Sequence, residues 1–478
     1  MITQFLDTVD GIVWGIPLIV LIMGTGILLT CRLKVLQFRK LGKALKYMVH
    51  NEEGGTGEVT SFGALATALS ATIGTGNIVG VATAVVAGGP GALFWMIIAA
   101  CFGMATKYAE GLLAIKYRIK KEDGTFLGGP FYYIEKGMKE KTGHNWKWLG
   151  KLFALFAVLA GALGIGTITQ INGITSAAEN FFDPNKSNVL FTIGSGEDAL
   201  AITLTTVIVG LVVTVAAALV IIGGIKRIAK VSEVVVPFMA VIYILCGLTI
   251  ILTNLEAVPG AFYQIFVGAF DPKAVAGGIV GITVKVAIQK GVARGIFSNE
   301  AGLGSAPIAA AAAQTKDPVR QGLVTMTGTF IDTIIVCTMT GLAIIISGAW
   351  APELGLEGAA ITMYAFQNAL PFPQAVSSFL LMICLMFFAF TTILGWDYYA
   401  ERCLEYLSDR NMKAVKIYRW IYIAAVFVGP YLTVSVVWCI ADIFNGLMAF
   451  PNIIALLALS GIVGKETRDY FARKKAEN

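Results

Sequence analysis

Histidine, charged residues and paired cysteines are all scarce in this chain of 478 residues. Its two histidines, His50 and His144, offer no histidine-rich metal site and no histidine-centred acid–base pair. The seven cysteines are scattered without a CxxC spacing, which predicts neither a disulfide framework nor a thiolate metal site. The GxSxG and HExxH motifs of common hydrolases are absent. The sequence therefore predicts that the protein is not an enzyme.

The shortage of charge points to a membrane. Charged residues make up 14% of the chain and hydrophobic residues 56%, whereas a soluble domain carries about 25% charged residues. A helix spans the bilayer with about 20 mostly apolar residues. The first apolar run is expected to be a true span, because residues 1–10 lack the Lys and Arg of a signal peptide. The predicted spans are 11–31, 61–87, 90–115, 152–182, 199–223, 231–254, 275–313, 321–348, 374–398, 418–438 and 443–463.

The basic residues predict the orientation of these spans. Loops rich in Lys and Arg remain on the cytoplasmic side of a membrane. Alternate gaps between the spans hold 30 of the 36 Lys and Arg residues. We therefore predict that the N-terminus lies outside and the C-terminus in the cytoplasm. The rich segments are 32–60, 116–151, 224–230, 314–320, 399–419 and the tail from 464.

Two of the basic segments also look amphipathic. Residues 33–48 and 131–138 alternate apolar with polar or basic side chains. Such segments are typical of helices that lie in the interface and are attracted by anionic lipid. A role in gating is the alternative.

Two polar, glycine-rich clusters interrupt the apolar runs. They are Ser70–Asn77 (SATIGTGN) and Ser298–Ser305 (SNEAGLGS), which share the pattern Ser-x-x-x-Gly-x-Gly-[Asn/Ser]. Five spans separate their starting points, so the two copies cross the membrane in opposite directions. Paired broken helices in an inverted repeat are typical of secondary transporters, whose binding site lies between the breaks. A glycine-rich helix-packing face is the alternative.

The clusters complete the predicted architecture. We expect an all-α polytopic membrane protein with eleven transmembrane helices, ten of them in two inverted repeats of five, each with one discontinuous helix. The remaining helix is an extra N-terminal one. The predicted divisions are a peripheral helix with its amphipathic segment (1–60), the first repeat (61–254), an outside loop (255–274), the second repeat (275–463) and a cytoplasmic tail (464–478).

Three long motifs carry a family resemblance. Residues 70–96, 128–138 and 297–323 resemble the alanine/glycine:cation symporter family, and the similarity runs nearly end to end. The resemblance implies a LeuT-type fold and sodium-coupled import of alanine or glycine across a prokaryotic plasma membrane. Proton coupling is the alternative, because Asp332 lies inside a span, where an ionisable residue is a functional candidate.

The candidate substrate site follows from the chemistry of an amino acid. Backbone amides near Gly76 and Asn77 suit its carboxylate, and carbonyls near Phe297 suit its ammonium group. The resemblance implies that Asn77 and Gln170 contact the substrate. Trp396 is expected to shorten the pocket, with an interfacial position as the alternative. The full candidate set is Thr75, Gly76, Asn77, Gly164, Gly166, Gln170, Phe297, Ser298, Asn299, Thr392 and Trp396.

The candidate sodium ligands come from the related fold. The resemblance implies that the carbonyls of Ser70 and Ile73 meet the hydroxyls of Thr391 and Thr392. A threonine hydroxyl can instead bond a carbonyl of its own helix, and this alternative stays open.

Other ionisable residues lie in or near the spans. Arg294 and Glu300 flank the second cluster, and we expect them to pair in a gate. Lys107 and Glu110 are expected near a cytoplasmic helix end, as a helical ion pair or as snorkelling side chains.

A channel is the rival class of function. Selectivity filters use symmetric rings of carbonyls or charges, whereas one asymmetric pair of broken helices favours an occluded binding site. The expected partners are a small neutral amino acid, co-transported sodium and the lipid bilayer, without nucleic acid. The oligomeric state, the stoichiometry and the choice between alanine and glycine stay open.

Overall fold

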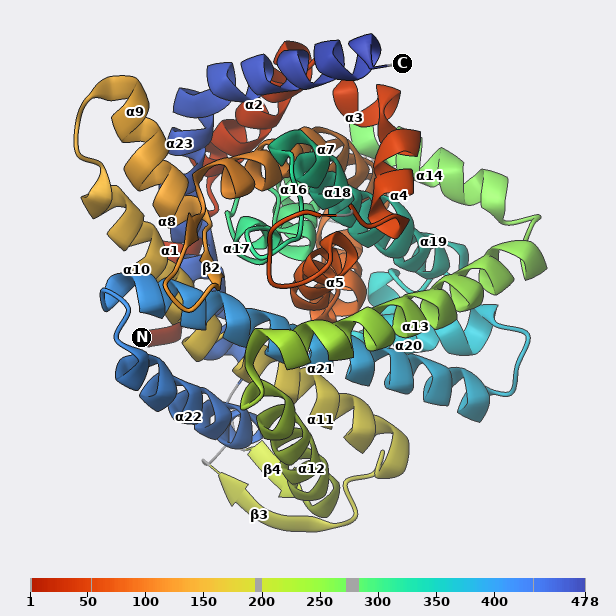
Figure 1. Ribbon diagram of the computed structural model, residues 1–478. Helices are drawn as coiled ribbons and strands as arrows, with labels where there is room; N and C mark the ends of the chain where they lie inside the picture. The colour runs from red at the N-terminus through yellow and green to blue at the C-terminus, as the bar shows by residue number, and fades with distance from the viewer. Residues whose placement is uncertain (1, 53, 194–199, 272–282, 433, 478) are drawn as a thin grey trace.

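The computed structural model describes residues 2–52, 54–193, 200–271, 283–432 and 434–477 and is mostly helical (Figure 1). Its described part contains two short antiparallel hairpins, β1 (Ile119–Lys120) with β2 (Phe126–Leu127) and β3 (Val189–Ile193) with β4 (Leu200–Thr203). The helices are α1 (Ile2–Val13), α2 (Ile16–Arg32), α3 (Leu36–Arg39), α4 (Leu41–Val49), α5 (Ser61–Thr72), η1 (Gly76–Gly80), α6 (Val81–Gly88), α7 (Gly91–Tyr117), α8 (Pro130–Tyr132), η2 (Tyr133–Gly137), α9 (Met138–Thr142), α10 (Lys147–Leu163), α11 (Ile168–Phe182), α12 (Leu204–Ile221), α13 (Gly224–Thr253), α14 (Val258–Phe270), α16 (Val284–Asn299), α17 (Ala306–Ala310), α18 (Pro318–Thr329), η4 (Phe330–Cys337), α19 (Thr338–Ile346), η5 (Pro352–Leu354), α20 (Ala359–Ala369), α21 (Gln374–Leu407), α22 (Met412–Val428), η6 (Gly429–Tyr431) and α23 (Val434–Ala476).

The membrane-spanning helices account for most of the predicted spans. In the described part of the chain, eight helices are long and apolar enough to cross a bilayer. A ninth span is the broken pair of α5 with η1 and α6, which bends by 55°. The other two predicted spans correspond to shorter helices, α16 with 16 residues and α22 with 17, and residues 272–282 lie outside the described part. The count of eleven therefore stays a prediction.

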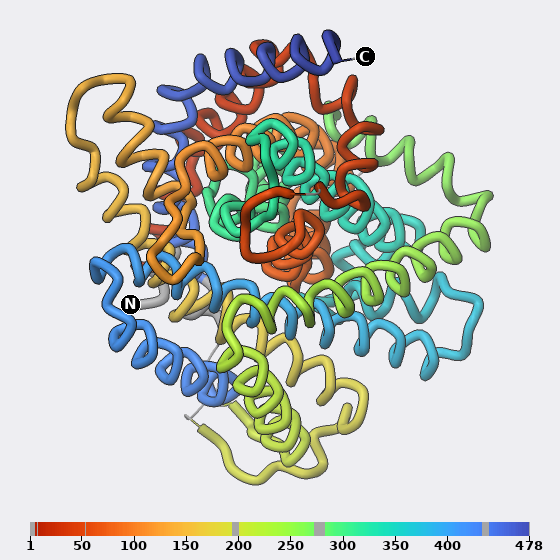
Figure 2. The backbone as a smooth tube through the Cα atoms, viewed as in Figure 1, coloured from red at the N-terminus to blue at the C-terminus, as the bar shows by residue number. Residues whose placement is uncertain are grey.

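The broken helices occupy the middle of the molecule. In Figure 1, α5, α16 and α17 lie in the centre of the view and the longer helices surround them. The backbone tube of Figure 2 shows the same arrangement, with the N-terminal α2 and the C-terminal α23 on the periphery. Because lipid offers no hydrogen-bond partners, unwound backbone is tolerated only where protein or a cavity surrounds it. The arrangement satisfies this requirement at both breaks.

Two of the predicted loops contain helices. The predicted outside loop 255–274 holds α14, whose Phe266 and Phe270 pack edge-on against Phe94 of α7. The gap between the spans 321–348 and 374–398 holds α20, and the hydroxyl of its Thr362 donates to the Ile78 carbonyl at 3.2 Å. Both helices therefore pack onto the core.

The two segments predicted to be interfacial differ in the structure. Residues 33–48 form α3 and α4, which expose much of their surface. The prediction for 131–138 is wrong, because Phe131, Tyr133 and Ile134 are fully buried. The hydroxyl of Tyr133 donates to Asn452 of α23. An amphipathic pattern gives no indication of whether the apolar face meets lipid or another helix.

Candidate functional site

The first break separates α5 from η1 at Ile73–Thr75. The Ile73 backbone is extended, with ψ 93°, so the helical hydrogen bonds stop there. A Cβ atom on Gly74 would lie 2.5 Å from the Thr392 hydroxyl oxygen and 3.2 Å from Oε1 of Gln170. The break therefore needs glycine at this position in order to pack against α21 and α11.

The second break separates α16 from α17 at residues 300–305. Glu300, Gly302 and Gly304 all have left-handed backbones, with φ of +57°, +90° and +85°. Such φ values are costly for a residue with a Cβ atom, so Glu300 is the strained position here. The Asn299 side chain stabilises the turn, because its Oδ1 accepts from the Ala301 amide at 2.9 Å.

The carboxyl group of Asp332 in η4 connects the two breaks. Asn77 Nδ2, just after the first break, donates to Oδ1 at 2.8 Å. Ser298 Oγ, just before the second, donates to Oδ2 at 2.9 Å, and Thr333 Oγ1 donates to the same oxygen at 2.7 Å. Asp332 is fully buried, so these three donors satisfy a carboxyl group that has no access to water.

A small cavity lies between the two breaks, with an empty volume of about 230 Å³. Its walls come from both broken helices and from α11 and α21. Five of the eleven predicted substrate residues line it: Gly76, Gln170, Phe297, Thr392 and Trp396. The other lining residues are Ala71, Thr72, Gly74, Ile165 and Glu300. The structure therefore brings the centre of the predicted set together around one space.

The remaining predicted substrate residues lie behind this lining. The amide side chain of Asn77 faces Asp332, and its Oδ1 accepts from the Gly74 amide at 2.9 Å. Ser298 and Asn299 bond to Asp332 and Thr333. Thr75 is buried, and among the described residues its hydroxyl has no hydrogen-bond partner. A buried hydroxyl without a partner is costly, which makes Thr75 a candidate to bond a ligand.

Two further predicted glycines, Gly164 and Gly166, lie between α10 and α11 and have a packing role. A Cβ atom on Gly164 would lie 2.2 Å from the Ala441 Cβ, and one on Gly166 would lie 2.4 Å from the Trp396 Cβ. Both glycines lie in the interruption between the end of α10 at Leu163 and the start of α11 at Ile168. The Gly166 carbonyl accepts from the Tyr422 hydroxyl at 2.7 Å. The glycines therefore allow α11 to approach α21 and α23 closely.

Gln170 and Trp396 have defined positions in the cavity wall. Gln170 Oε1 accepts from the Thr75 amide at 3.3 Å, and its Nε2 donates to the Ile165 carbonyl at 2.9 Å. The Trp396 side chain is buried, with 1% of its surface exposed. The alternative of an interfacial position for Trp396 is therefore wrong.

The predicted cation ligands are only partly adjacent. Thr392 Oγ1 lies 3.3 Å from the Ile73 carbonyl oxygen, to which it donates, and 3.0 Å from the Phe388 carbonyl oxygen of its own helix. Thr391 Oγ1 donates to the carbonyls of Phe387 and Phe388, both at 3.0 Å. The prediction for Ser70 concerns its carbonyl; its hydroxyl bonds to the Thr67 carbonyl of its own helix. Thr392 and Ile73 thus place two hard oxygen atoms side by side, of the kind that suits a small cation.

The ionisable side chains pair differently from the prediction. Arg294 lies 3.3 Å from Asp442 of α23 and does not pair with Glu300. Glu300 accepts from Ser305 and faces Lys107. Lys107 and Glu110 are buried, which excludes snorkelling. Asp442 was not predicted as a site residue because it lies one residue before the predicted span 443–463. The signal that could have found it is an aspartate directly beside an apolar run.

Phe297 separates the central cavity from a second one. That second cavity has an empty volume of about 490 Å³ and is lined by Phe297, Arg294, Asp442 and Trp14, among others. The Arg294 guanidinium lies 5.4 Å from the centre of the Phe297 ring. Trp14 Nε1 donates to the Asp442 carbonyl at 2.8 Å. The aromatic ring and the ion pair therefore close one end of the site.

The opposite end is closed by backbone pairing. Thr56 bridges to Thr315 and Val59 to Ala313, which joins the segment before α5 to the segment after α17. The Arg118 guanidinium donates to the carbonyls of Ala313 and Thr56, each at 2.7 Å. Burial lowers the pKa of Arg118 to about 10, although Glu58 opposes this effect. Arg118 therefore stays protonated at neutral pH and holds the two segments together.

A central cavity between two broken helices, closed at both ends, defines a helical membrane transporter. The fold is LeuT-like: the crystal structure of MhsT in complex with L-phenylalanine superposes with a TM-score of 0.54, covering 88% of this chain and 99% of that one at 14% identity. The model of the sodium:alanine symporter family matches residues 1–478, and the chain belongs to this family.

Relatives from bacteria and archaea match over nearly the whole chain. The sodium/alanine symporter AgcS of Methanococcus maripaludis is 47% identical, over 99% of this chain and 98% of its own. An uncharacterized transporter of Haemophilus influenzae is 53% identical, over 99% of this chain and 97% of its own. The probable sodium/glutamine symporter GlnT of Bacillus subtilis is 36% identical, over 99% and 92%. The predictions of a transporter and of the family are confirmed, and the protein is a cation-coupled amino-acid symporter.

Proposed function

We propose that the protein imports small neutral amino acids, alanine and/or glycine, together with sodium by alternating access. The observation that carries this proposal is the cavity between the two breaks, with Thr392 in its wall and the Ile73 carbonyl accepting from the Thr392 hydroxyl. The narrow space between the breaks and the Trp396 wall favour a short side chain. The name of AgcS supports alanine and sodium, while the name of GlnT indicates that relatives can differ in substrate.

The roles of the residues follow from their positions. The Gly76 backbone faces the substrate at the first break, with Thr75 behind it, and Phe297 and Gln170 enclose the substrate. Asn77, Ser298 and Asn299 hold the breaks in shape through Asp332 and Thr333. Sodium binds where the Ile73 carbonyl meets the Thr392 hydroxyl, and the Ser70 carbonyl and the Thr391 hydroxyl complete the site.

The membrane arrangement is part of the same proposal. The chain crosses a prokaryotic plasma membrane eleven times, with the N-terminus outside and the basic C-terminal tail in the cytoplasm, as the distribution of Lys and Arg indicates. The two inverted repeats, 61–254 and 275–463, then place the Arg294–Asp442 pair on the outer side and Arg118 on the inner side.

Proton coupling is the second candidate, and one observation favours it. Asp332 is a buried carboxyl group between the two breaks, the position in which a proton could be carried. Its three hydrogen bonds instead favour a structural role, which places sodium coupling first.

Uptake by proteoliposomes distinguishes these proposals. Labelled alanine uptake is followed with an inward sodium gradient, an inward proton gradient or neither. The matched variants are Thr392→Ala and Thr249→Ala, because Thr249 bonds only its own helix, away from the cavity. We expect concentrative uptake with sodium alone, lost in Thr392→Ala and retained in Thr249→Ala. Uptake driven by protons alone would refute sodium coupling.

A further inference from the structure

A basic groove lies where the chain leaves the first span. The C-terminal part of α23 crosses the periphery of the molecule beside α2 and ends near α3 (Figures 1 and 2). Between these elements is a groove with an empty volume of about 960 Å³. Its basic lining residues are Lys34, Arg39, Lys40, Arg468 and Lys475.

The charge of the groove is uncompensated by the protein. No aspartate or glutamate is among the residues that line it. Within the described residues, no ion pair joins any of the five basic side chains to a carboxylate. Like charges gathered in one place repel one another, so the groove favours an anion.

The floor of the groove is apolar. Leu33 and Leu36 are buried, with 6% and 4% of their surfaces exposed, and Phe471 packs against the same core. The Lys40 ammonium lies 5.0 Å from the centre of the Phe471 ring. A ligand that matches this lining carries a negative group next to hydrocarbon.

A strained turn gives the groove its shape. Lys34 and Val35 both have left-handed backbones, with φ of 55° and 59°. This conformation is a genuine outlier for a β-branched residue such as Val35, and the Val35 amide bonds to the Thr30 carbonyl at 2.8 Å. The turn separates α2 from α3, and Arg39 at the end of α3 lines the groove together with Lys40 and with Arg468 and Lys475 of α23. Strain of this kind persists where surrounding structure enforces it and is frequent at ligand sites.

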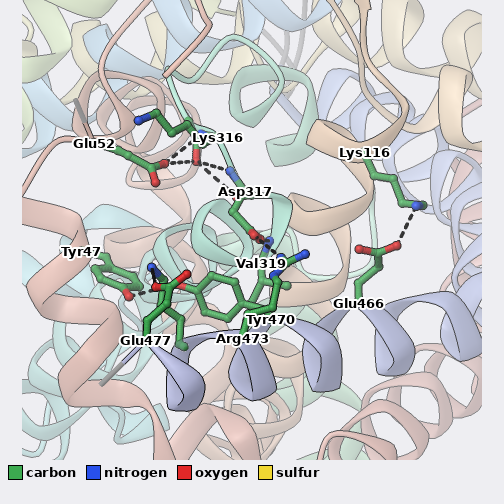
Figure 3. A network of polar contacts seen from close by, with 12 residues as sticks. Tyr47, Glu52, Lys116, Lys316, Asp317, Val319, Glu466, Tyr470, Arg473 and Glu477 are labelled. Carbon is green, nitrogen blue, oxygen red and sulfur yellow. Dashed lines mark hydrogen bonds and ion pairs between the residues drawn. The ribbon is translucent and has the colours of Figure 1, made fainter. Parts of the chain in front are cut away.

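The opposite face of the C-terminal helix is held by the protein itself. Figure 3 shows Arg473 paired with Asp317, Tyr470 beside Tyr47 and Glu466 paired with Lys116. Arg468 and Lys475 lie two residues from these contacts, which is about 200° around a helix. One face of the helix is therefore fixed to the core and the other is presented to the groove.

The position of the groove matches the depth of lipid headgroups. It begins where α2, a membrane-spanning helix, ends at Arg32. The 43-residue α23 rises about 1.5 Å per residue. It is therefore much longer than the hydrocarbon core of a bilayer, which is about 30 Å thick. Its basic C-terminal end therefore lies outside the hydrocarbon, at the membrane surface.

We propose that this groove binds the headgroup of an anionic phospholipid. The phosphodiester lies between Arg39 and Lys40 of one wall and Arg468 and Lys475 of the other. One acyl chain follows Leu33, Leu36 and Phe471 toward the bilayer. Basic pockets at the cytoplasmic ends of spanning helices recognise such headgroups in general.

Native mass spectrometry of the full chain tests this proposal. The protein is released from micelles that contain equal amounts of phosphatidylglycerol and phosphatidylcholine. The test variant is Arg468→Ala/Lys475→Ala, and the charge-retaining variant is Arg468→Lys/Lys475→Arg. The matched control is Lys413→Ala/Lys416→Ala, because these two lysines are exposed on α22 and away from the groove.

We expect the wild type, the control and the charge-retaining variant to keep phosphatidylglycerol in preference to phosphatidylcholine. The Arg468→Ala/Lys475→Ala variant should bind it about tenfold more weakly, or weaker still, since each basic residue near a membrane surface contributes to such binding. Equal retention of both lipids by the wild type would overturn the proposal. So would equal loss in the control variant, or displacement of the lipid by inorganic phosphate, which would indicate a site for a free anion.

Discussion

Replacing Asp332 by alanine should disable the protein by separating the two breaks. Three donors, from Asn77, Ser298 and Thr333, would lose their acceptor at distances of 2.8, 2.9 and 2.7 Å. Leaving one buried donor unsatisfied costs about 1–3 kcal/mol. Asn77 Nδ2 and Ser298 Oγ keep other partners, the Asp332 backbone carbonyl at 3.2 Å and Cys337 Sγ at 3.3 Å. The three donors therefore cost at most about 3–9 kcal/mol, against a total stability of about 5–15 kcal/mol for a typical domain. Asp332→Ala should therefore fold poorly or lose most of its thermal stability.

Asp332→Asn provides the informative comparison. If the amide oxygen of the asparagine takes the place of Oδ2, it still accepts from Ser298 and Thr333, but its NH2 group then faces Asn77 Nδ2, which is also a donor. We expect an intermediate loss, of about 1–3 kcal/mol for one unsatisfied group, with residual sodium-driven uptake. The assay is thermal unfolding in detergent together with uptake of labelled alanine by proteoliposomes.

Two results would refute this reasoning. Asp332→Ala with the thermal stability of the wild type would mean that the carboxyl group does not hold the breaks together. Asp332→Asn with full stability but no uptake would assign Asp332 to proton transfer, and the sodium proposal would then fail.

Three further predictions concern the wall of the cavity, the backbone pairing that closes one end of it, and Asp317, which pairs with Arg473 of α23. Trp396→Phe should improve the uptake of amino acids larger than alanine relative to alanine in a competition assay, since one methylene in a pocket changes selectivity by about 1–3 kcal/mol; an unchanged ranking would contradict the role of Trp396 as the wall. Gly57→Ala should impair folding or uptake, because its Cβ would lie 2.4 Å from the Ala313 carbonyl, whereas Gly42→Ala has open space and should behave as the wild type; equal activity of both would contradict the closure by backbone pairing. Burial raises the pKa of Asp317, with Arg473 opposing and Glu52 and Glu466 adding to the effect, so its charge disfavours the folded state at neutral pH. Asp317→Asn should therefore match or exceed the wild type in melting temperature at neutral pH. The difference should shrink as the pH falls through the raised pKa of Asp317 and vanish only below the lower pKa of this carboxyl group in the unfolded chain; a lower melting temperature of Asp317→Asn at neutral pH would contradict this reasoning.

The positions of the two breaks could be predicted because glycine leaves a local signal. Gly74, Gly302 and Gly304 lie where the helices stop, and the need for room or for a left-handed backbone is a property of the residue itself. The order of polar and apolar residues likewise indicated most of the spans. Local chemistry was sufficient for these features.

The partners of the buried polar residues could not be predicted in the same way. Asn77 bonds to Asp332, which is 255 residues away, and Arg294 pairs with Asp442 instead of the nearer Glu300. The apolar face of 131–138 meets other helices and not lipid. Each of these outcomes depends on which helices become neighbours, and hydropathy along one chain does not encode that choice.

Alanine binding as a function of sodium tests the central claim most directly. Two ligands that stabilise the same closed state must each strengthen the binding of the other by the same factor. We predict that the alanine Kd of the purified protein falls as sodium rises at constant pH, and that Thr392→Ala removes this dependence while Thr249→Ala retains it. An alanine Kd that does not change with the sodium concentration but does change with pH would contradict the account.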